Sequence, residues 1–354
     1  MKKTILFMVT NGTGLGHLTR GLAIARRLRE IEKQYEIIFL TTSLATEVLR
    51  ENNFMFYYVP TKGLMPEEIT WKVWNTFLSE QIESIIKLYE PVAIVFDGAV
   101  PYMGLLANLN KKHAFKSVWI KRECYKKAFD KLEEKEKAFD LIIVPNEVND
   151  VIISNTKKKV YTNPIIFLEE NEAYLRESIR KQINLKDDES LFYIQLGAGN
   201  INNIERTLET IVASIIKNPQ YHILLGESII GKHLDIKSNQ ITRIRNFPNA
   251  QYFRAIDGAI SAAGYNTVHE LLLFGVPTLF VPNKETAQDD QMARVKKVEK
   301  ENAGLILEDL TFQEIERGVN YLVNNKEQLS INAKALIKGN GALEAAKYIK
   351  ALLD

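Results

Sequence analysis

The chain has 354 residues, of which 46% are hydrophobic and 25% charged, and its formal net charge at pH 7 is +2. This length favours two domains over a single core, and the near-zero net charge provides no field that would attract nucleic acid. Cys124 is the only cysteine, which excludes an internal disulfide and a multi-cysteine metal site and is typical of a cytoplasmic protein.

Apolar runs of strand length alternate with helical patterns through the first half of the chain. The runs are continuous, which is typical of parallel strands buried on both faces. The first run breaks at Asn11 with no cleavage site after it, so we interpret it as a core strand and not as a signal peptide. The expected strands are Thr4–Thr10, Glu36–Thr42, Phe54–Val59, Val92–Asp97, Ser117–Ile120 and Asp140–Pro145, with helices such as Leu18–Glu30 and Trp71–Glu90 between them.

The same alternation starts again near Leu191, with the segments LFYIQLG, YHILLG, GAISAAG and PTLFVPN separated by helical patterns. Two doubly wound α/β domains with parallel sheets are therefore expected. The junction is placed within Val160–Phe167, where a proline follows an asparagine. This gives an N-terminal domain of residues 1–163, a C-terminal domain of residues 164–340 and a final helix of residues 341–354. No stretch approaches the roughly 20 apolar residues that span a bilayer.

A glycine-rich turn follows the first strand and leads into an amphipathic helix, as in nucleotide-binding folds. Here His17 replaces the third glycine of the dinucleotide pattern G-x-G-x-x-G, since the glycines are Gly12, Gly14 and Gly16. The second strand ends in two threonines instead of the acidic residue that binds a ribose, and there is no G-K-[ST] sequence. The turn therefore argues against NAD and ATP sites.

His17 lies at the start of this helix, where the helix dipole disfavours an imidazolium cation. A neutral imidazole can act as the general base for a hydroxyl, and the alternative is that His17 only caps the turn. Asp97 ends a strand at the sheet edge where α/β proteins bind ligands, so it could orient His17, help to deprotonate an acceptor or cap the next helix. Arg20, one turn after His17, could face a phosphate or an acidic acceptor, or form a surface salt bridge.

Another glycine-rich turn, QLGAGN, follows the strand that begins near Leu191. Gly197 and Gly199 open this turn, and Asn200, Asn202 or Asn203 could cap the following helix, which would form a phosphate cradle at a helix N-terminus. Alternatively, the glycines only allow the strand and the helix to pack closely.

The segment GYNTVHELLLFGVPTLFVPN carries the most informative pattern. Its first residue, Gly264, ends a strand, and a helix begins near Asn266 and Thr267, where unpaired amides can bind a diphosphate. Glu270 can accept hydrogen bonds from a ribose diol, and the polar residues 288–291 after the next strand suit sugar hydroxyls. The alternative is that all of these are ordinary helix-start and N-cap residues.

Together, GTGLGH near the N-terminus, LGAGN, and the segment above with its DDQ continuation resemble the family 28 glycosyltransferases over essentially the whole chain. The resemblance implies a GT-B fold, in which two Rossmann-like domains face a central cleft and the C-terminal helix packs back on the N-terminal domain. It also implies inverting transfer of a sugar from a nucleotide diphosphate donor, usually a UDP-sugar such as UDP-N-acetylglucosamine or a UDP-hexose, without a metal cofactor.

The resemblance assigns residues to both sides of the cleft. On the acceptor side it places His17 beside the acceptor hydroxyl. The residues themselves suggest Asp97 as its partner, and Gly14, Gly16 and Arg20 as further residues of the acceptor side. The donor's diphosphate would contact Gly264, Asn266 and Thr267, its ribose Glu270, and its sugar Asp290 and Gln291, with Gly197, Gly199, Asn200 and Phe247 around them.

The chain departs from the peptidoglycan N-acetylglucosaminyltransferases of this family at its first turn. Asn11-Gly12 and Leu15-Gly16 replace paired glycines, and LTR follows the histidine where a proline is usual. These differences argue against the peptidoglycan acceptor. Pro248 lacks an N–H group in the region that would bind the base, so the base also stays open.

The sequence does not distinguish among lipid-linked, glycan and small-molecule acceptors. Residues 1–165 carry a net charge of +5, which suits an anionic acceptor, peripheral contact with the inner face of the membrane, or an ordinary solvated surface. The spacing of Trp71, Trp74 and Phe77 favours a core stripe over an acceptor groove. The pattern GxGHxxR at 14–20 is also similar to the nucleotide-sugar hydrolase of the pseudaminic acid pathway, so hydrolysis is one alternative and a non-catalytic GT-B subunit another.

Overall fold

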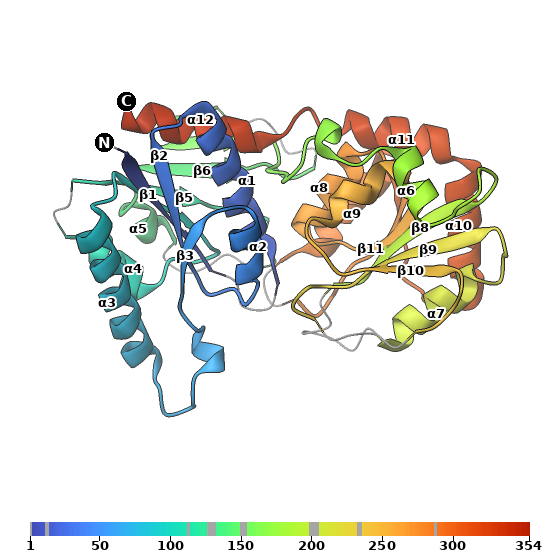
Figure 1. Ribbon diagram of the computed structural model, residues 1–354, viewed down its shortest axis with the longest axis horizontal. Helices are drawn as coiled ribbons and strands as arrows, with labels where there is room; N and C mark the ends of the chain where they lie inside the picture. Colours follow the sequence, from blue (N-terminus) through green and yellow to red (C-terminus); the bar gives the residue numbers. More distant parts are fainter. Residues whose placement is uncertain are drawn as a thin grey trace.

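The computed structural model describes residues 2–10, 14–111, 114–124, 126, 132–148, 154–197, 205–231, 236–286 and 289–354. Their strands form two separate parallel sheets, one in each half of the chain (Figure 1). Hydrophobic clusters lie on both faces of each sheet and fill the space between the sheet and its helices. The expected pair of parallel-sheet α/β domains is confirmed.

The N-terminal sheet has a strand order that reverses near its middle. Its spatial order is β3 (Met55–Tyr58), β2 (Tyr35–Thr41), β1 (Lys3–Val9), β4 (Ala93–Asp97), β5 (Lys116–Ile120), β6 (Leu141–Pro145) and β7 (Lys159–Thr162). The reversal falls between β1 and β4, which is where open α/β sheets bind ligands. The register pairs Val9 with Asp97, so both strands end side by side at that point.

Side chains of β1 alternate between the two faces of this sheet. Phe7 and Val9 belong to a cluster shared with one helix, and Leu6 and Met8 to a cluster shared with another. The first helix is α1 (Gly16–Ile31) and the second is α3 (Trp71–Tyr89). The remaining helical elements of this half are α2 (Thr46–Glu51), η1 (Lys62–Leu64), α4 (Met103–Leu109) and α5 (Leu132–Glu136).

The aromatic stripe on α3 is only partly a core stripe. Trp74 is fully buried and donates a hydrogen bond through its indole N–H to the carbonyl of Pro60 at 2.9 Å. Trp71 and Phe77, in contrast, are exposed. The interpretation as core therefore holds for Trp74 alone.

The C-terminal sheet repeats the same topology. Its spatial order is β10 (Ile241–Ile244), β9 (Tyr221–Gly226), β8 (Ser190–Gln195), β11 (Gly258–Ala262), β12 (Thr278–Val281) and β13 (Leu305–Ile306), with the reversal between β8 and β11. Its helical elements are η2 (Glu170–Glu172), α6 (Arg176–Gln182), α7 (Glu205–Ile215), η3 (Asn249–Ala255), α8 (Tyr265–Leu273), α9 (Gln291–Lys300), α10 (Phe312–Asn324) and α11 (Lys326–Ala335).

The sequence patterns miss three strands, β7, β10 and β13. Each is short, and neither β7 nor β10 is a continuous apolar run, so they lack the signal used for the other strands. β7 overlaps the start of the predicted junction Val160–Phe167, so the last strand of the first sheet lies where the chain was expected to leave that sheet. The domain limits at 163 and 340 stay predictions.

The last helix, α12 (Gly341–Leu353), returns to the N-terminal half and packs against α1, as expected (Figure 1). At the start of α12, residues 340–341 lie beside residues 163–166, the segment through which the chain first passes from the N-terminal to the C-terminal half. The Gly341 N–H donates to the Pro164 carbonyl at 2.8 Å, and the Asn340 side chain both accepts from the Ile166 N–H and donates to its carbonyl. A Cβ on Gly341 would lie 1.9 Å from the Asn163 carbonyl oxygen, so this close pairing requires glycine. The two segments that connect the halves of the chain are thus held together by hydrogen bonds.

Within the part of the chain that the structure describes, no helix has both the length and the apolar character needed to cross a membrane.

Candidate active site

A cleft of about 390 Å³ lies between the two halves of the chain, at the ends of β8 and β11. The N-terminal half contributes the turn before α1, and the C-terminal half contributes the start of α8 and the loops after β9, β10 and β12. The described lining residues include Gly14, Gly16, Thr19, Arg122, Gly197, Glu227, Phe247, Asn249, Gly264, Tyr265, Asn266, Thr267, Glu270, Asp289 and Gln291. Most residues assigned to the donor from the sequence therefore meet in one place.

His17, Asp97 and Arg20 form a compact group at the strand reversal of the N-terminal sheet. The His17 Nδ1 lies 2.6 Å from Asp97 Oδ1, and Arg20 donates to both oxygens of that carboxylate, at 3.1 Å from Nε and 2.6 Å from Nη2. Asp97 and Arg20 are buried, whereas the His17 side chain is 27% exposed. Arg20 Nη2 also lies 2.8 Å from His17 Nδ1, but this guanidinium nitrogen has Asp97 Oδ1 as a closer acceptor at 2.6 Å. Because the carboxylate can only accept hydrogen bonds, we assign the proton to Nδ1, which places the basic lone pair on Nε2.

The electrostatics of this group keep the imidazole neutral. Burial lowers the pKa of His17 below its usual value, and the hydrogen bond and charge of Asp97 oppose this only in part. Burial alone would raise the pKa of Asp97, but the charge of Arg20 and the His17 hydrogen bond outweigh it, and the pKa is lowered. The site thus holds an ionised carboxylate that orients a neutral histidine, which is the state that a general base requires.

The structure corrects two expectations for the N-terminal side of the cleft, those for Arg20 and Asp97. Arg20 does not line the cleft: it is fully buried, since its guanidinium is enclosed between Asp97 and the ring of Tyr265, whose centre is 5.3 Å away. Nor is its salt bridge at the surface. Asp97 does not cap the next helix, because α4 follows Tyr102 and the Asp97 carboxylate is engaged by His17 and Arg20.

The start of α8 forms the opposite wall of the cleft. Gly264 is its N-cap residue, and a Cβ built on Gly264 would meet no protein atom within 4 Å. Asn266 donates from Nδ2 to the Gly16 carbonyl at 3.3 Å, which joins the two walls, while its Oδ1 is buried with no hydrogen-bond partner among the described residues. The first amides of α8 have no acceptor within the helix, and with Thr267 beside them they border the cleft formed by the described residues.

Glu270 is a buried carboxylic acid at the back of the cleft. Burial alone raises the pKa of Glu270 to about 8. None of the described residues forms an ion pair with it. An unpaired buried acid is costly, so its presence in a cleft wall points to a ligand that supplies hydrogen-bond donors.

The polar loop before α9 differs from the expectation at one position. Asp290 is the N-cap of α9, where its Oδ1 accepts from the Ala293 N–H at 2.9 Å, and it is not among the described lining residues. Its neighbours Asp289 and Gln291 line the cleft instead. A side chain held as a cap is turned away from the cleft, so the N-cap alternative describes Asp290.

The remaining assigned residues divide into three groups. Phe247 lines the cleft, and Gly197 does so with φ +99°, a backbone conformation that favours glycine. Gly199 and Asn200 lie outside the described residues. Gly14, like Gly264, has open space where a Cβ would be.

Sequence reasoning missed Arg122, and it included Asp289 only as one member of the polar stretch 288–291. Arg122 is the second residue after β5, and a pair of basic residues, Lys121 and Arg122, directly after a buried strand was the available signal. Behind them, Arg294 is buried and donates to Glu147 at 2.6 Å and 3.0 Å. No group of three or more His, Cys, Asp or Glu side chains within the described ranges is placed to hold a metal ion.

Two parallel-sheet domains that meet at their strand reversals form the GT-B arrangement, and solved glycosyltransferases share it. The chain superposes on a MurG of Acinetobacter baumannii with a TM-score of 0.67 and 17% identity, covering 99% of each chain. It superposes on the glycotransferase of kitacinnamycin with a TM-score of 0.72 and 15% identity, covering 100% of each chain. The protein therefore has the GT-B fold of glycosyltransferases.

Sequence comparisons narrow this class. Residues 218–349 match the glycosyltransferase family 28 C-terminal domain. The chain is 24% identical to the UDP-N-acetylglucosamine--N-acetylmuramyl-(pentapeptide) pyrophosphoryl-undecaprenol N-acetylglucosamine transferase of Acetivibrio thermocellus, covering 98% of each chain. It is 26% identical to the enzyme of the same name from Aquifex aeolicus, covering 91% of this chain and 93% of the relative. The protein is thus a glycosyltransferase that resembles family 28.

Proposed function

We propose that this glycosyltransferase moves a sugar, such as N-acetylglucosamine or a hexose, from a UDP-sugar to a hydroxyl of a lipid-linked or glycan acceptor, with inversion at the anomeric carbon. The observation that carries the proposal is an oriented neutral base, His17, directly after Gly16 of the cleft wall, with the start of α8 and Glu270, which has no ion-pair partner among the described residues, lining the same cleft. The names of the relatives support the UDP-sugar and the lipid-linked acceptor.

The proposed reaction is a single displacement. His17 Nε2 takes the proton of the acceptor hydroxyl while its oxygen attacks the anomeric carbon, and the bond from that carbon to the diphosphate oxygen breaks. UDP leaves with the electron pair, and the amides and dipole at the start of α8 stabilise its negative charge. Glu270 holds the ribose hydroxyls, so the donor is positioned by groups that take no part in proton transfer.

The proposal is tested first by donor binding and then by product analysis. UDP-sugars that bind the folded protein should raise its melting temperature, and the best of them is then incubated with and without candidate acceptors. A glycosylated acceptor detected by mass spectrometry supports transfer. Release of free sugar at catalytic rates without an acceptor would instead establish the hydrolase alternative, and a chain that binds no nucleotide sugar would favour a non-catalytic subunit.

Gly264→Ala tests the diphosphate site. A Cβ there meets no protein atom, so the melting temperature should fall by less than about 5 °C. The new methyl group enters the space assigned to the phosphates, so UDP affinity should fall about tenfold or more, comparable to losing a charge-assisted hydrogen bond. Calorimetric titration with UDP measures this. Gly63→Ala is the control, because a Cβ there would meet only Thr61 Oγ1 at an ordinary 3.8 Å and Gly63 is not among the described cleft residues. Equal UDP affinity in both variants would contradict the site.

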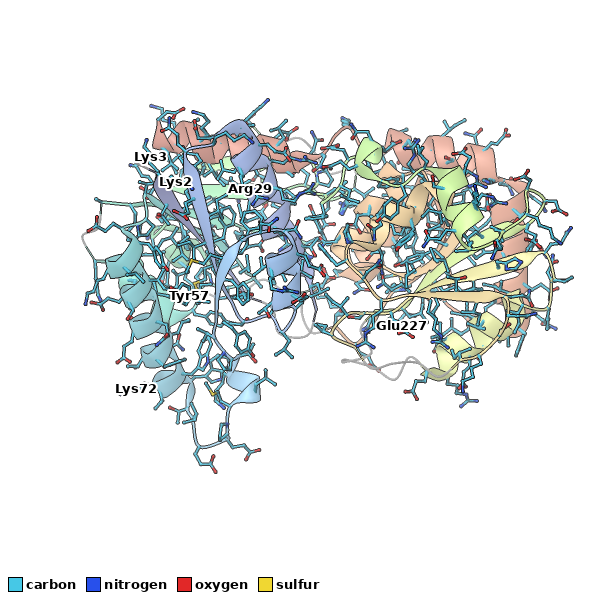
Figure 2. All side chains as sticks on the ribbon, viewed as in Figure 1. Lys2, Lys3, Arg29, Tyr57, Lys72 and Glu227 are labelled. Atoms are coloured by element: carbon cyan, nitrogen blue, oxygen red, sulfur yellow. The ribbon has the colours of Figure 1, made fainter. Side chains whose placement is uncertain are left out.

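Peripheral membrane contact is the second part of the proposal. The exposed apolar side chains Leu64, Trp71 and Met103 lie on η1 and at the starts of α3 and α4, and the Trp71 ring stacks with Tyr102 at 6.4 Å. Lys72 projects at the lower end of α3 (Figure 2). Apolar side chains beside a lysine suit an anionic lipid surface, which would bring a lipid-linked acceptor to the enzyme.

Trp71→Ser tests this surface. Removing one large apolar group should weaken co-sedimentation with phosphatidylglycerol vesicles by about tenfold. Ile331→Ser, at an exposed apolar residue of α11 in the other half of the chain, should leave vesicle binding unchanged. Equal vesicle binding by the wild type and both variants would show that these apolar side chains do not contact the membrane.

A further inference from the structure

The described residues that line the cleft carry an unbalanced set of charges. Arg122 is the one basic side chain among them, against three acidic ones, Glu227, Glu270 and Asp289. Glu227 is paired with Arg243 at 2.8 Å, and burial raises the pKa of Glu270 to about 8, so it is largely protonated near neutral pH. Figure 2 shows Glu227 at the side of the C-terminal half that faces the N-terminal half. A nucleoside diphosphate sugar would bring further negative charge, which makes a cation in the cleft wall important for its binding.

Arg122 comes from the N-terminal half but lies beside the helix end of the other half. Its guanidinium carbon is 5.0 Å from the ring centre of Tyr265, the first residue of α8, directly after Gly264. Its side chain is only 12% exposed and borders the same cleft as Gly264 and Thr267. Phosphate oxygens between the two would accept hydrogen bonds from the Arg122 guanidinium of the N-terminal half and from the first amides of α8 in the C-terminal half.

Arg122 can exchange partners without leaving a buried charge unpaired. It pairs with Asp289, whose Oδ1 also accepts from Arg294 Nη2 at 2.8 Å. Burial would raise the pKa of Asp289, but the charges of Arg122 and Arg294 outweigh it and lower the pKa, so the carboxylate is ionised. Arg294 is fully buried and fixed by Glu147, so it remains with Asp289 when Arg122 moves. The usual penalty for stranding a buried ion is therefore avoided.

We infer that Arg122 is a phosphate-binding residue of the donor site, which exchanges Asp289 for the diphosphate oxygens when the donor enters. The inference rests on the proposed function, because it needs a diphosphate in this cleft. It means that the N-terminal half binds the donor as well as the acceptor. The same contact would stabilise the negative charge that develops on the leaving UDP, so Arg122 would contribute to turnover as well as to affinity.

Calorimetric titration of the full chain with UDP and with uridine tests this assignment. Arg122→Gln should weaken UDP binding by about tenfold to a hundredfold, the range of one to two charge-assisted contacts, and leave uridine binding unchanged because uridine has no phosphate. Arg122→Lys keeps the charge but not the planar fork, so its UDP affinity should lie between the wild type and Arg122→Gln.

Arg27→Gln is the matched control. Arg27, on α1, pairs with Glu172 of η2, so this variant also loses a buried ion pair between distant parts of the chain, but away from the cleft. Its UDP and uridine affinities should both equal those of the wild type. Equal loss of UDP and uridine in Arg122→Gln, or no loss of UDP, would overturn the inference. A wild-type chain that binds uridine and UDP equally weakly, or neither, would instead refute the diphosphate donor of the proposed function.

Discussion

His17→Asn is expected to lower kcat for sugar transfer by about 100- to 10,000-fold, which is the usual contribution of a general base. Asparagine keeps a polar side chain of similar reach but cannot accept the acceptor's proton at the required position. UDP affinity should change little, because the described lining of the donor cleft contains the neighbours of His17 and not its imidazole. Initial rates at saturating donor, together with titration of UDP, separate the two effects.

A histidine outside the site serves as the control for this result. His222 lies on β9 and pairs with Glu189 at 3.5 Å, so His222→Asn should retain wild-type turnover. If His17→Asn transferred sugar at the same rate as His222→Asn, His17 would not be the base.

The pH dependence provides a second measure of the same assignment. The base acts when unprotonated, and burial lowers the pKa of His17, so kcat/KM should fall only at pH values below about 6.5. In Asp97→Asn, the hydrogen bond and charge that raise this pKa are lost, so the acidic limb should move to still lower pH while the maximal rate also drops. An acidic limb above the usual histidine pKa would contradict the described electrostatics.

Glu270→Gln is expected to weaken the binding of both UDP and uridine by about tenfold to a hundredfold, because both contain the ribose diol. Hydrogen bonds donated by the ribose hydroxyls favour the ionised carboxylate of Glu270, both of whose oxygens accept, whereas the amide of similar shape has only one acceptor oxygen. Calorimetric titration with the two ligands measures the change. The pattern differs from that of Arg122→Gln, which should affect UDP alone. Unchanged uridine affinity in Glu270→Gln would place the ribose elsewhere.

Glu270→Gln is expected to weaken ligand binding but to increase the stability of the folded chain at neutral and higher pH. The pKa of Glu270 is about 8 in the folded chain, above its unfolded value of about 4.3, so the folded state holds the proton more tightly. The stability of the wild type therefore falls relative to Glu270→Gln as the pH rises from about 4.3 to 8. The variant's advantage in melting temperature should be small at pH 5 and largest at about pH 9. A constant difference across this range would show that Glu270 ionises normally.

The sequence predicts the sheet strands well where they are continuous apolar runs, since burial on both faces leaves that pattern in each strand. It also locates His17, Gly264 and Glu270, because strand ends and helix starts have recognisable residue types. The three missed strands are short, and their formation depends on pairing with neighbours that are distant in the chain. Their local sequence carries little of that information.

The positions of the site residues that the sequence did not predict correctly also depend on contacts between residues that are distant in the chain. Whether Asp289 or Asp290 faces the cleft depends on which carboxylate caps α9, and one residue of offset exchanges their roles. Arg20 lies one helical turn beyond His17, the proposed base, but only the folded chain shows that it is buried against Asp97. Arg122 gains its position from an ion pair with a residue 167 positions away.

The joined segments at Gly341 and Pro164 limit how the two halves can move. A single flexible linker leaves two domains free to twist and slide, whereas two segments joined by hydrogen bonds restrict those motions. Together with contacts across the cleft such as Asn266 to the Gly16 carbonyl, this leads us to expect that the remaining motion is mainly a rotation about the joined segments. Such a rotation would change the width of the cleft, and a ligand that contacts both walls would set that width.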